Sequence, residues 1–212
     1  MNSQLEKWLQ TLAELPDMPN VHNLYSKHTP EGQVRLSNLQ RYFDQVLALG
    51  PTTLLIGEAP GYQGSYRTGV PFSSEAHLLG PINKFGLFGG PANGYNRVFS
   101  DERIWKEPSA TVVQKTLDTL PTLPLIWATF PLHPHKLGIE LSNRAPNAAE
   151  VQLGSEILQA LVAAVGPLRV VAVGNVAANC LANIGIPADK VRHPSHGGAT
   201  QFREQLTALL AG

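Results

Sequence analysis

The chain carries, at residues 53–61, the stretch TLLIGEAPG, in which a short apolar run passes into a loop rich in glycine and proline. The unbroken apolar run predicts a strand that is buried on both faces. Beyond the loop, the segment continues through Thr68-Gly69-Val70-Pro71-Phe72 to the helix-like residues 74–79. Strand, loop and helix in this order are typical of α/β proteins, whose functional groups lie on loops at the carboxyl ends of parallel strands.

Helices and strands alternate on both sides of this stretch. Apolar residues recur at helical spacing from Leu5 to Leu15 and from Leu36 to Leu47, which predicts two amphipathic helices that end before Pro16 and Gly50-Pro51. Further strands are predicted at Leu123–Phe130, Arg169–Val173 and Lys190–Arg192. Further helices are predicted at Ala149–Val165, around Val112, Val113 and Leu117 with Ser109 as the cap, and around Phe202, Leu206 and Leu209. We therefore predict one domain, residues 1–212, folded as a three-layer α/β/α sandwich with a short central parallel sheet.

The composition limits the class of protein. With 212 residues, of which 43% are hydrophobic and 15% charged, the chain can bury one substantial core without disulfides or metals. A formal net charge of zero argues against a polybasic nucleic-acid binder, although it leaves room for a local basic face. The lone cysteine, Cys180, excludes an internal disulfide, an iron–sulfur cluster and a cysteine-ligated structural zinc.

Targeting and membrane signals are not seen in the sequence. The chain shows neither a basic segment followed by an apolar core at its start nor a stretch of about eighteen apolar residues that could span a membrane. We therefore expect a cytoplasmic monomer that contacts no membrane and needs neither a cofactor nor a metal.

A second segment, RHPSHGG at residues 192–198, places a histidine at the end of another predicted strand, before a small loop and a helix. Together with GEAPG at residues 57–61 and Pro71-Phe72 downstream, it resembles two motifs of the uracil-DNA glycosylase superfamily, in the expected order. The resemblance covers roughly residues 35–205 and includes Arg35, Asn38-Leu39, Asn143-Arg144-Ala145-Pro146 and Gly174-Asn175-Val176-Ala177. Some members carry an iron–sulfur cluster on cysteines that this chain lacks, so the resemblance is to a cluster-free branch.

The resemblance implies a monofunctional DNA glycosylase, a hydrolase that cuts the N-glycosidic bond of uracil or a related deaminated base in DNA and so starts base excision repair. Its partner would be DNA that contains the deaminated base, and its product the free base. Because a base inside a duplex is inaccessible, such an enzyme flips the nucleotide out and holds the base by stacking and by hydrogen bonds to its edge.

Candidate site residues follow from these motifs. The candidate catalytic residues are Glu58, which would orient and activate the attacking water, and His193, which would donate a hydrogen bond to the departing base. Structural roles stay open for both, because a carboxylate at a strand end can accept backbone N–H bonds and a loop histidine can cap a helix. Phe72 is the candidate stacking platform, and the candidate base-binding residues are Gly57, Ala59, Pro60, Gly61, Phe72 and Ala128.

Contacts to DNA are expected from the second motif. The resemblance implies that Ser195, His196, Gly197 and Gly198 press into the minor groove and fill the space that the flipped base leaves. Arg192 is the candidate phosphate contact. A plain turn and a surface ion pair explain the same residues equally well. Other cations near the expected site loops, which either contact phosphates or are solvated, are Lys27, Arg67, Lys84, Arg97, Lys136, Arg144 and Arg203.

One position departs from the resemblance. In related proteins an asparagine near the end of the second strand commonly reads the edge of uracil, and this chain has Ala128 there. Alanine cannot make paired hydrogen bonds to a base, which leaves an altered substrate range, weak or absent activity, or a substitution introduced into the chain. Thr129 could supply one bond, but neighbouring strand residues face opposite sides. A DNA-binding, damage-sensing module without turnover is therefore the alternative function.

Histidines suggest a further alternative, a metal hydrolase. His133 and His135 could bind a metal together with His193 and His196, but no nearby carboxylate completes a ligand set. A structural or DNA-contacting His-Pro-His turn is the competing interpretation.

A nucleotide-binding Rossmann protein is disfavoured, because residues 174–178 lack the full glycine fingerprint. The loop Phe85–Asn96 is expected to border the site. Trp105 and Trp127 are expected in the core rather than as additional stacking platforms.

Overall fold

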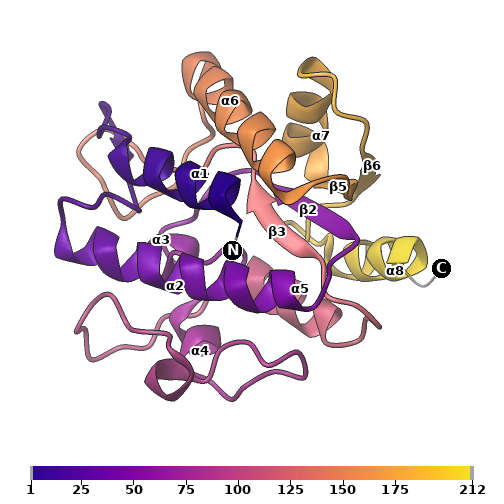
Figure 1. Cartoon of the computed structure of the whole chain (residues 1–212), viewed down its shortest axis with the longest axis horizontal. Coiled ribbons are helices and arrows are strands. Elements are labelled where there is room, and N and C mark those ends of the chain that lie inside the picture. Colours follow the sequence, from indigo (N-terminus) through magenta and orange to yellow (C-terminus); the bar gives the residue numbers. More distant parts are fainter. Residues whose placement is uncertain (1, 211–212) are drawn as a thin grey trace.

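The computed structural model describes residues 2–210 as a parallel sheet between two layers of helices (Figure 1). The sheet has the spatial order β3-β2-β5-β6, and every neighbouring pair in it is parallel. This confirms the predicted α/β/α sandwich with a short central parallel sheet. The strands are β2 (Thr53–Gly57), β3 (Leu125–Ala128), β5 (Arg169–Val173) and β6 (Asp189–Val191).

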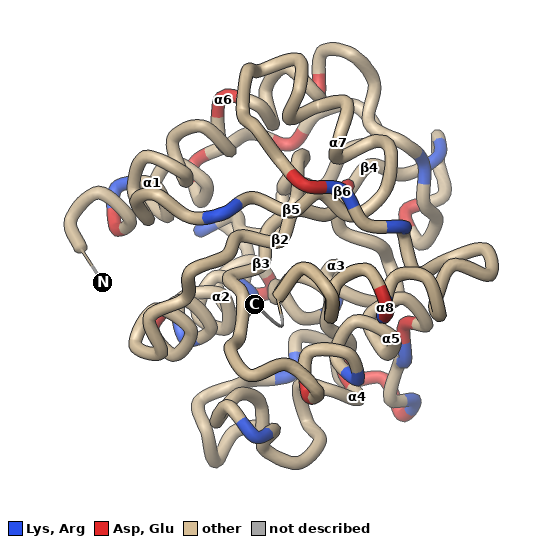
Figure 2. The backbone as a smooth tube through the Cα atoms, turned by 90° about the vertical axis from the view of Figure 1, so that its right-hand side faces the viewer, with Lys and Arg blue, Asp and Glu red and all other residues tan. Residues whose placement is uncertain are grey.

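Helices cover both faces of the sheet (Figure 2). One layer contains α1 (Ser3–Glu14), α2 (Pro30–Ala48), α6 (Ala148–Val165) and α7 (Gly174–Asn183), and the other contains α5 (Pro108–Leu117) and α8 (Ala199–Leu210). From β2 the chain continues to β3, which is the outer strand on one side of the sheet, and from β5 it continues to β6, the outer strand on the other side. The strand order therefore reverses between the carboxyl ends of β2 and β5, which is where open α/β sheets bind their ligands.

Both predicted amino-terminal helices are present, with caps that the sequence supplies. The Asn2 side chain accepts a hydrogen bond from the Leu5 amide at 2.8 Å and caps α1. Thr29 caps α2 by accepting from the Gly32 amide at 3.1 Å, and Pro30 fits the first helical turn. α2 therefore begins earlier than its apolar pattern alone indicates.

Of the predicted strands, β3 is shorter than predicted, whereas β5 has the predicted bounds and β6 begins and ends one residue earlier. β3 spans Leu125–Ala128 instead of Leu123–Phe130, since Pro124 has no N–H to donate to the ladder. Its last residue, Ala128, pairs with Gly57, the last residue of β2. The two strands therefore end side by side, and the segments that follow them lie next to each other at the carboxyl ends of the strands.

The cap of α5 differs from the prediction. The Glu107 carboxylate accepts hydrogen bonds from the amides of Ser109 and Ala110, so Glu107 and not Ser109 is the cap. The prediction of Ser109 is wrong because Pro108 takes the first helical position, where a missing N–H costs nothing.

α6 is the longest helix of the second half of the chain. A capping box begins it, in which the Glu150 amide donates to Asn147 Oδ1 at 3.0 Å and the Asn147 amide donates to Glu150 Oε2 at 2.9 Å. By length and composition alone α6 could cross a membrane. In this fold its buried residues, among them Leu158 and Leu161, belong to the core and face α1.

Short elements that the sequence analysis did not predict surround the sheet. β1 (Val21–His22) and β4 (His133–Pro134) form a separate antiparallel pair. The others are α3 (Ser65–Thr68) and η1 (Gly90–Asn93), whereas α4 (Glu75–Leu78) corresponds to the predicted helix at residues 74–79.

The core is built around an indole of β3. Trp127 is 1% exposed and packs against Trp8 of α1 and Phe43 of α2 at ring-centroid distances of 4.9 and 6.0 Å. The prediction that Trp127 is a core residue is confirmed. Trp105 lies outside this core, half-buried in a surface loop, so the same prediction for Trp105 is wrong.

Candidate functional site

A cavity of about 450 Å³ opens at the carboxyl ends of the strands. All eight residues predicted to act on the base line it, and so do Ser195 and His196. These residues lie at the ends of β2 and β3 or in the segments that follow β2 and β6. The fold brings them together at the carboxyl ends of the strands. The full lining is Tyr25, Gly57, Glu58, Ala59, Pro60, Gly61, Gly64, Ser65, Pro71, Phe72, Glu107, Ser109, Trp127, Ala128, Pro131, Asn143, Arg144, Ala145, His193, Ser195 and His196.

The loop Phe85–Asn96 is not part of this lining. It packs against α2 instead, where Arg41 Nε donates to the Asn93 carbonyl at 3.0 Å and Asn38 Nδ2 to the Asn96 carbonyl at 2.8 Å. The prediction that this loop borders the site is therefore wrong: its glycines and asparagines form turns that fit the surface of a helix.

Glu58 follows the last residue of β2 and is half-buried in the cavity wall. Its backbone is fixed, because the Phe130 amide and the Thr129 hydroxyl donate to the Glu58 carbonyl at 3.0 and 2.8 Å. Within residues 2–210 its carboxylate has no hydrogen-bond or ion-pair partner. Burial raises the pKa of this carboxyl. The backbone of Glu58 is thus held in place, while its carboxylate is free to accept a proton.

Phe72 presents its ring to the same cavity from a strained backbone. Its φ is +45°, in the left-handed region that favours glycine, which costs an aromatic residue about 1 kcal/mol or more. Gln114 of α5 stabilises this conformation by donating to the Phe72 carbonyl at 2.9 Å. The ring lies over Gly57, where an added Cβ would come within 2.7 Å of Phe72 Cε2. Strain of this kind collects at functional sites.

His193 lies opposite Phe72, with ring centroids 6.4 Å apart. The Ser195 amide donates to His193 Nδ1 at 3.1 Å, and the Ser195 hydroxyl lies 2.7 Å from the same nitrogen. Because Nδ1 accepts, the proton of the neutral ring is on Nε2. Burial lowers the pKa of His193, and the Arg192 charge lowers it further. The site therefore holds a neutral imidazole with an Nε2–H donor.

Gly174 leaves room for the His193 side chain. It begins α7 after β5, with φ +87°, and a Cβ there would come within 3.0 Å of His193 Cβ. The absence of a side chain at Gly174 thus permits the close approach of His193.

Ala128 lines the cavity, half-buried, and brings no polar group to it. Thr129 does not replace the missing amide: its side chain donates to the Glu58 carbonyl and is 2% exposed. The position expected to read the base edge is therefore apolar, and its neighbour Thr129 holds the loop that carries Glu58.

Asn143 is a site residue to which the sequence analysis gave no role. Its Oδ1 accepts from the Tyr62 amide at 3.0 Å, and Gly61 lies beside it, since a Cβ there would be 3.5 Å from Asn143 Nδ2. Oδ1 is engaged, so Nδ2 is the polar group that Asn143 offers at the cavity rim. The only signal in the sequence was its place in the Asn143-Arg144-Ala145-Pro146 part of the resemblance.

The residues predicted to contact DNA fall into two groups. Arg192, His196 and Gly197 are exposed, and the Arg192 guanidinium has no ion-pair partner among the described residues. Ser195 is bonded to His193, and Gly198 is buried, with the His193 carbonyl oxygen 2.1 Å from where a Cβ would be. The first group is accessible to a ligand, whereas the second supports the histidine.

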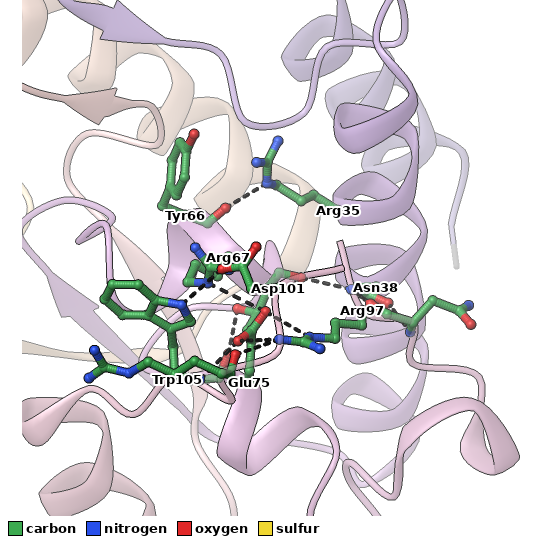
Figure 3. A network of polar contacts seen from close by, with 12 residues as sticks. Arg35, Asn38, Tyr66, Arg67, Glu75, Arg97, Asp101 and Trp105 are labelled. Carbon is green, nitrogen blue, oxygen red and sulfur yellow. Dashed lines mark hydrogen bonds and ion pairs between the residues drawn. The ribbon is translucent and has the colours of Figure 1, made fainter. Parts of the chain in front are cut away.

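A polar network ties the loop after α4 to the site loops (Figure 3). Fully buried Glu75 receives Arg97 Nε at 3.1 Å and the Trp105 amide at 2.9 Å, and Arg67 Nε lies 3.4 Å from it. Arg67 also pairs with Asp101. Arg67 and Arg97 are thus engaged by carboxylates and not available as free phosphate contacts.

Three more of the predicted cations are engaged within the fold, whereas Lys136 and Arg203 are exposed. Arg144 pairs with Glu150 at 2.6 Å, and Lys27 pairs with Glu14. Lys84 donates to the Leu120 carbonyl at 2.6 Å. Along the tube of Figure 2, Lys and Arg are interspersed with Asp and Glu, in keeping with the net charge of zero.

The histidines of the metal alternative do not converge. His133 Nδ1 lies 2.8 Å from the Pro60 carbonyl oxygen and Nε2 lies 3.0 Å from that of Glu140, so both ring nitrogens are occupied. His193 and His196 line the cavity, whereas His133 and His135 do not. Over residues 2–210, no three His, Cys, Asp or Glu side chains are grouped as metal ligands.

Comparisons with known proteins agree with this geometry. A family model described as the uracil DNA glycosylase superfamily matches residues 44–210. The crystal structure of wild-type SMUG2 from Pedobacter heparinus matches with a TM-score of 0.64 and 12% sequence identity, over 100% of both chains. At this identity the likeness establishes the fold alone. No curated protein matches the chain.

Proposed function

Because the chain belongs to the uracil DNA glycosylase superfamily, we propose that it hydrolyses the N-glycosidic bond of uracil or a related deaminated base in DNA. Glu58, Phe72 and His193 come from three separate segments, yet they line one cavity at the switch point of the sheet. This juxtaposition of an acceptor, a flat apolar ring and a neutral donor is the main support for the proposal. DNA containing the lesion is the partner, and base excision repair is the process that the reaction begins.

Phe72 and the loop of Gly57 bind the flipped base. The ring offers a stacking surface, and base stacking on an aromatic side chain contributes about 1–3 kcal/mol. Since the ring is packed on Gly57 and braced through Gln114, it is fixed before the base arrives. Binding energy is then not spent on ordering the platform.

His193 stabilises the departing base. As the bond from the sugar C1′ to the base nitrogen breaks, its electron pair leaves with the base, and Nε2–H donates to the oxygen on which the negative charge develops. A neutral imidazole is suited to this task, because it donates a hydrogen bond and can keep its proton afterwards. Ser195 sets the tautomer by donating to Nδ1.

Glu58 directs the water. The water oxygen forms the new bond to C1′, and its proton passes to the Glu58 carboxylate, which also stabilises the positive charge on the sugar. The raised pKa of the buried carboxyl makes it a better proton acceptor than an exposed glutamate.

Ala128 points to a substrate range that is not limited to uracil. An apolar wall cannot select one base edge through paired hydrogen bonds, and Asn143 Nδ2 at the rim is a single donor. We infer that the cavity accepts several deaminated bases, with Asn143 contributing to their alignment.

Free-base release from matched oligonucleotides carrying uracil, hypoxanthine or xanthine tests the proposal, with the chain and Ala128→Asn compared side by side. Release by the unchanged chain supports the glycosylase, and a shift toward uracil in Ala128→Asn supports the inferred role of position 128. His193→Ala, checked for folding, should lose about two to three orders of magnitude in rate. Equal rates for His193→Ala would contradict its role.

A damage-sensing module without turnover is the second candidate function, and Ala128 is the observation that favours it. It predicts binding to a lesion-bearing oligonucleotide without an alkali-labile abasic product. If neither the unchanged chain nor Ala128→Asn releases a base, and both still bind the lesion-bearing oligonucleotide, the result would favour this module.

A further inference from the structure

Three polar side chains that line the cavity are almost excluded from solvent. Tyr25, Ser65 and Trp127 belong to the lining and are 1%, 9% and 1% exposed. The other polar residues of the lining, such as Glu58 and His193, are half-buried or exposed. Because the three side chains line the cavity and are nearly inaccessible from outside, we call them the cavity floor.

The three groups of the cavity floor differ in what they can offer a ligand. The Tyr25 hydroxyl is engaged, since it donates to the Gly69 carbonyl at 3.0 Å. The Ser65 hydroxyl has no hydrogen-bond partner among residues 2–210. A hydroxyl both donates and accepts, so Ser65 adapts to either kind of ligand atom. The indole of Trp127 has no such freedom, because its Nε1–H is a donor only.

This indole donor is buried without a hydrogen-bond partner in the part of the chain that the structure describes. The other buried side-chain atoms in the same condition over residues 2–210, Arg67 Nε and Asn83 Nδ2, belong to residues outside the cavity lining. A buried donor that lacks an acceptor costs free energy, so such groups are rare in folded proteins. Trp127 therefore combines an unmet donor with a place in the cavity wall.

The other tryptophans of the chain have acceptors for their indole N–H groups. Trp8 Nε1 donates to the Ile157 carbonyl at 2.9 Å. Trp105 Nε1 donates to Asp101 Oδ2 at 3.0 Å. The fold thus satisfies the donors of both residues and leaves Trp127, on the strand that ends at the cavity, without an acceptor of its own.

The ring of Trp127 is enclosed by other aromatic rings. Trp8 and Phe43 pack against it from the helical layer. The Tyr25 ring stacks on it, with centroids 6.2 Å apart and an interplanar angle of 30°. Since close packing on these sides prevents the indole from turning toward an acceptor within the fold, the donor is fixed before a ligand arrives. The cavity is then the place from which an acceptor can come.

We propose that Trp127 Nε1–H donates to the carbonyl oxygen that deamination introduces into a base, and that it thereby distinguishes the deaminated base from its amino parent. Uracil and hypoxanthine bear an oxygen where cytosine and adenine bear an amino group. An amino group would meet Nε1–H donor to donor and leave both unpaired in a buried place. The proposal rests on the proposed function and fits the apolar Ala128, because one donor reads the oxygen shared by several deaminated bases.

Nuclear magnetic resonance tests this hydrogen bond directly. The probe is a single-stranded oligonucleotide with 2′-fluoroarabinouridine, whose fluorine disfavours positive charge on the sugar and so prevents cleavage. Its binding should move the Trp127 indole proton downfield, and the protons of Trp8 and Trp105, whose acceptors lie within the protein, much less. The same oligonucleotide with pyrimidin-2-one, which lacks the oxygen in question, should not produce this shift. An unmoved Trp127 signal at saturating uracil oligonucleotide, or equal shifts with both bases, would overturn the proposal.

Trp127→Phe removes the donor and keeps an aromatic ring in the core. The unchanged chain should bind the uracil oligonucleotide at least about tenfold more tightly than the pyrimidin-2-one oligonucleotide, and this ratio should fall to within about twofold in Trp127→Phe. Trp8→Phe is the matched control, since it shortens a second buried indole, 5% exposed, and should keep the ratio. An unchanged ratio in folded Trp127→Phe would contradict the role of Nε1–H.

Turnover and base reading are measured separately in this design. Release of uracil from a cleavable oligonucleotide without a shift of the Trp127 signal would keep the glycosylase and reject the donor. A shift of that signal without any release would reject the glycosylase and keep the donor.

Discussion

Gly57 leaves open the space that the Phe72 ring occupies. At this position a Cβ would lie 2.7 Å from Phe72 Cε2 and 2.9 Å from Cζ, closer than real side-chain contacts allow. The position of the ring that we propose for base stacking therefore depends on the absence of a side chain at Gly57 of β2. At the same scale, Ser195 decides which nitrogen of His193 carries the proton. Single atoms thus determine both the position of the Phe72 ring and the tautomer of His193.

Gly57→Ala should displace the Phe72 ring and reduce base release at least tenfold, because the added methyl and the ring cannot share the space. The comparison is Gly61→Ala, whose Cβ would meet Asn143 at an ordinary 3.5 Å, so that its loss should be clearly smaller. Initial rates on a uracil oligonucleotide, with circular dichroism as the check on folding, measure both. Similar losses in the two variants would show that the ring position is not what Gly57 protects.

Among the elements, the short helices α3 and α4 matter more for the site than their length suggests. They carry Arg67 and Glu75, and Glu75 binds the long loop that leads to Glu107 and α5 (Figure 3). The buried Glu75 carboxylate lies between two guanidinium groups and fixes α3 and α4, which precede and follow Phe72, relative to each other. Arg67 is buried and Arg97 is largely buried, so removing the Glu75 charge leaves Arg97 without its carboxylate partner and leaves Arg67 with Asp101 alone.

Glu75→Gln should lower the free energy of unfolding by about 3 kcal/mol, because it leaves Arg67 and Arg97 beside a neutral group in a buried network. Urea denaturation measures the change. Glu156→Gln is the control: Glu156 is exposed on α6 and bonded only to Gln152 among the described residues, so the expected change is within about 0.5 kcal/mol. A change of that size for Glu75→Gln would mean that the network adds little to stability.

For the whole molecule, one buried and three half-buried histidines couple folding to pH. Burial lowers the pKa of His22, His77, His133 and His193 below the ordinary value. Each therefore binds fewer protons in the folded chain than in the unfolded chain as the pH falls below that value. Their contribution to stability is complete above the unfolded pKa of about 6.5 and is lost as the pH falls through the lowered values.

The free energy of unfolding should therefore decrease as the pH is lowered from about 7.5 to about 5.5, by less than about 1.4 kcal/mol per pH unit for each histidine. Urea denaturation across this range gives the slope. Glu58, whose pKa is raised by burial, acts in the opposite direction and mainly at lower pH. His77→Gln removes one titrating group and should flatten the slope, whereas a flat profile for the unchanged chain would refute the coupling.

The sequence predicted the main elements and most of the cavity lining, and its errors have local causes. Apolar periodicity identified the helices and strands of the sandwich, and the two motifs identified Glu58, Phe72 and His193. Ser109 was wrong as a cap because Pro108 takes the first helical position, which puts the cap two residues earlier, at Glu107. The loop Phe85–Asn96 and Trp105 were misplaced because composition does not say which surface a loop packs against.

By itself, the sequence determined the class of fold, because the alternation of apolar strands and amphipathic helices admits few arrangements other than a covered parallel sheet. It also supplied the residue types of the site and the absence of a polar side chain at Ala128. Only the tertiary structure decided that Asn143 reaches the cavity and that Thr129 holds the backbone of Glu58. Those facts depend on contacts between segments far apart in the chain, and periodicity along a sequence contains no information about such distances.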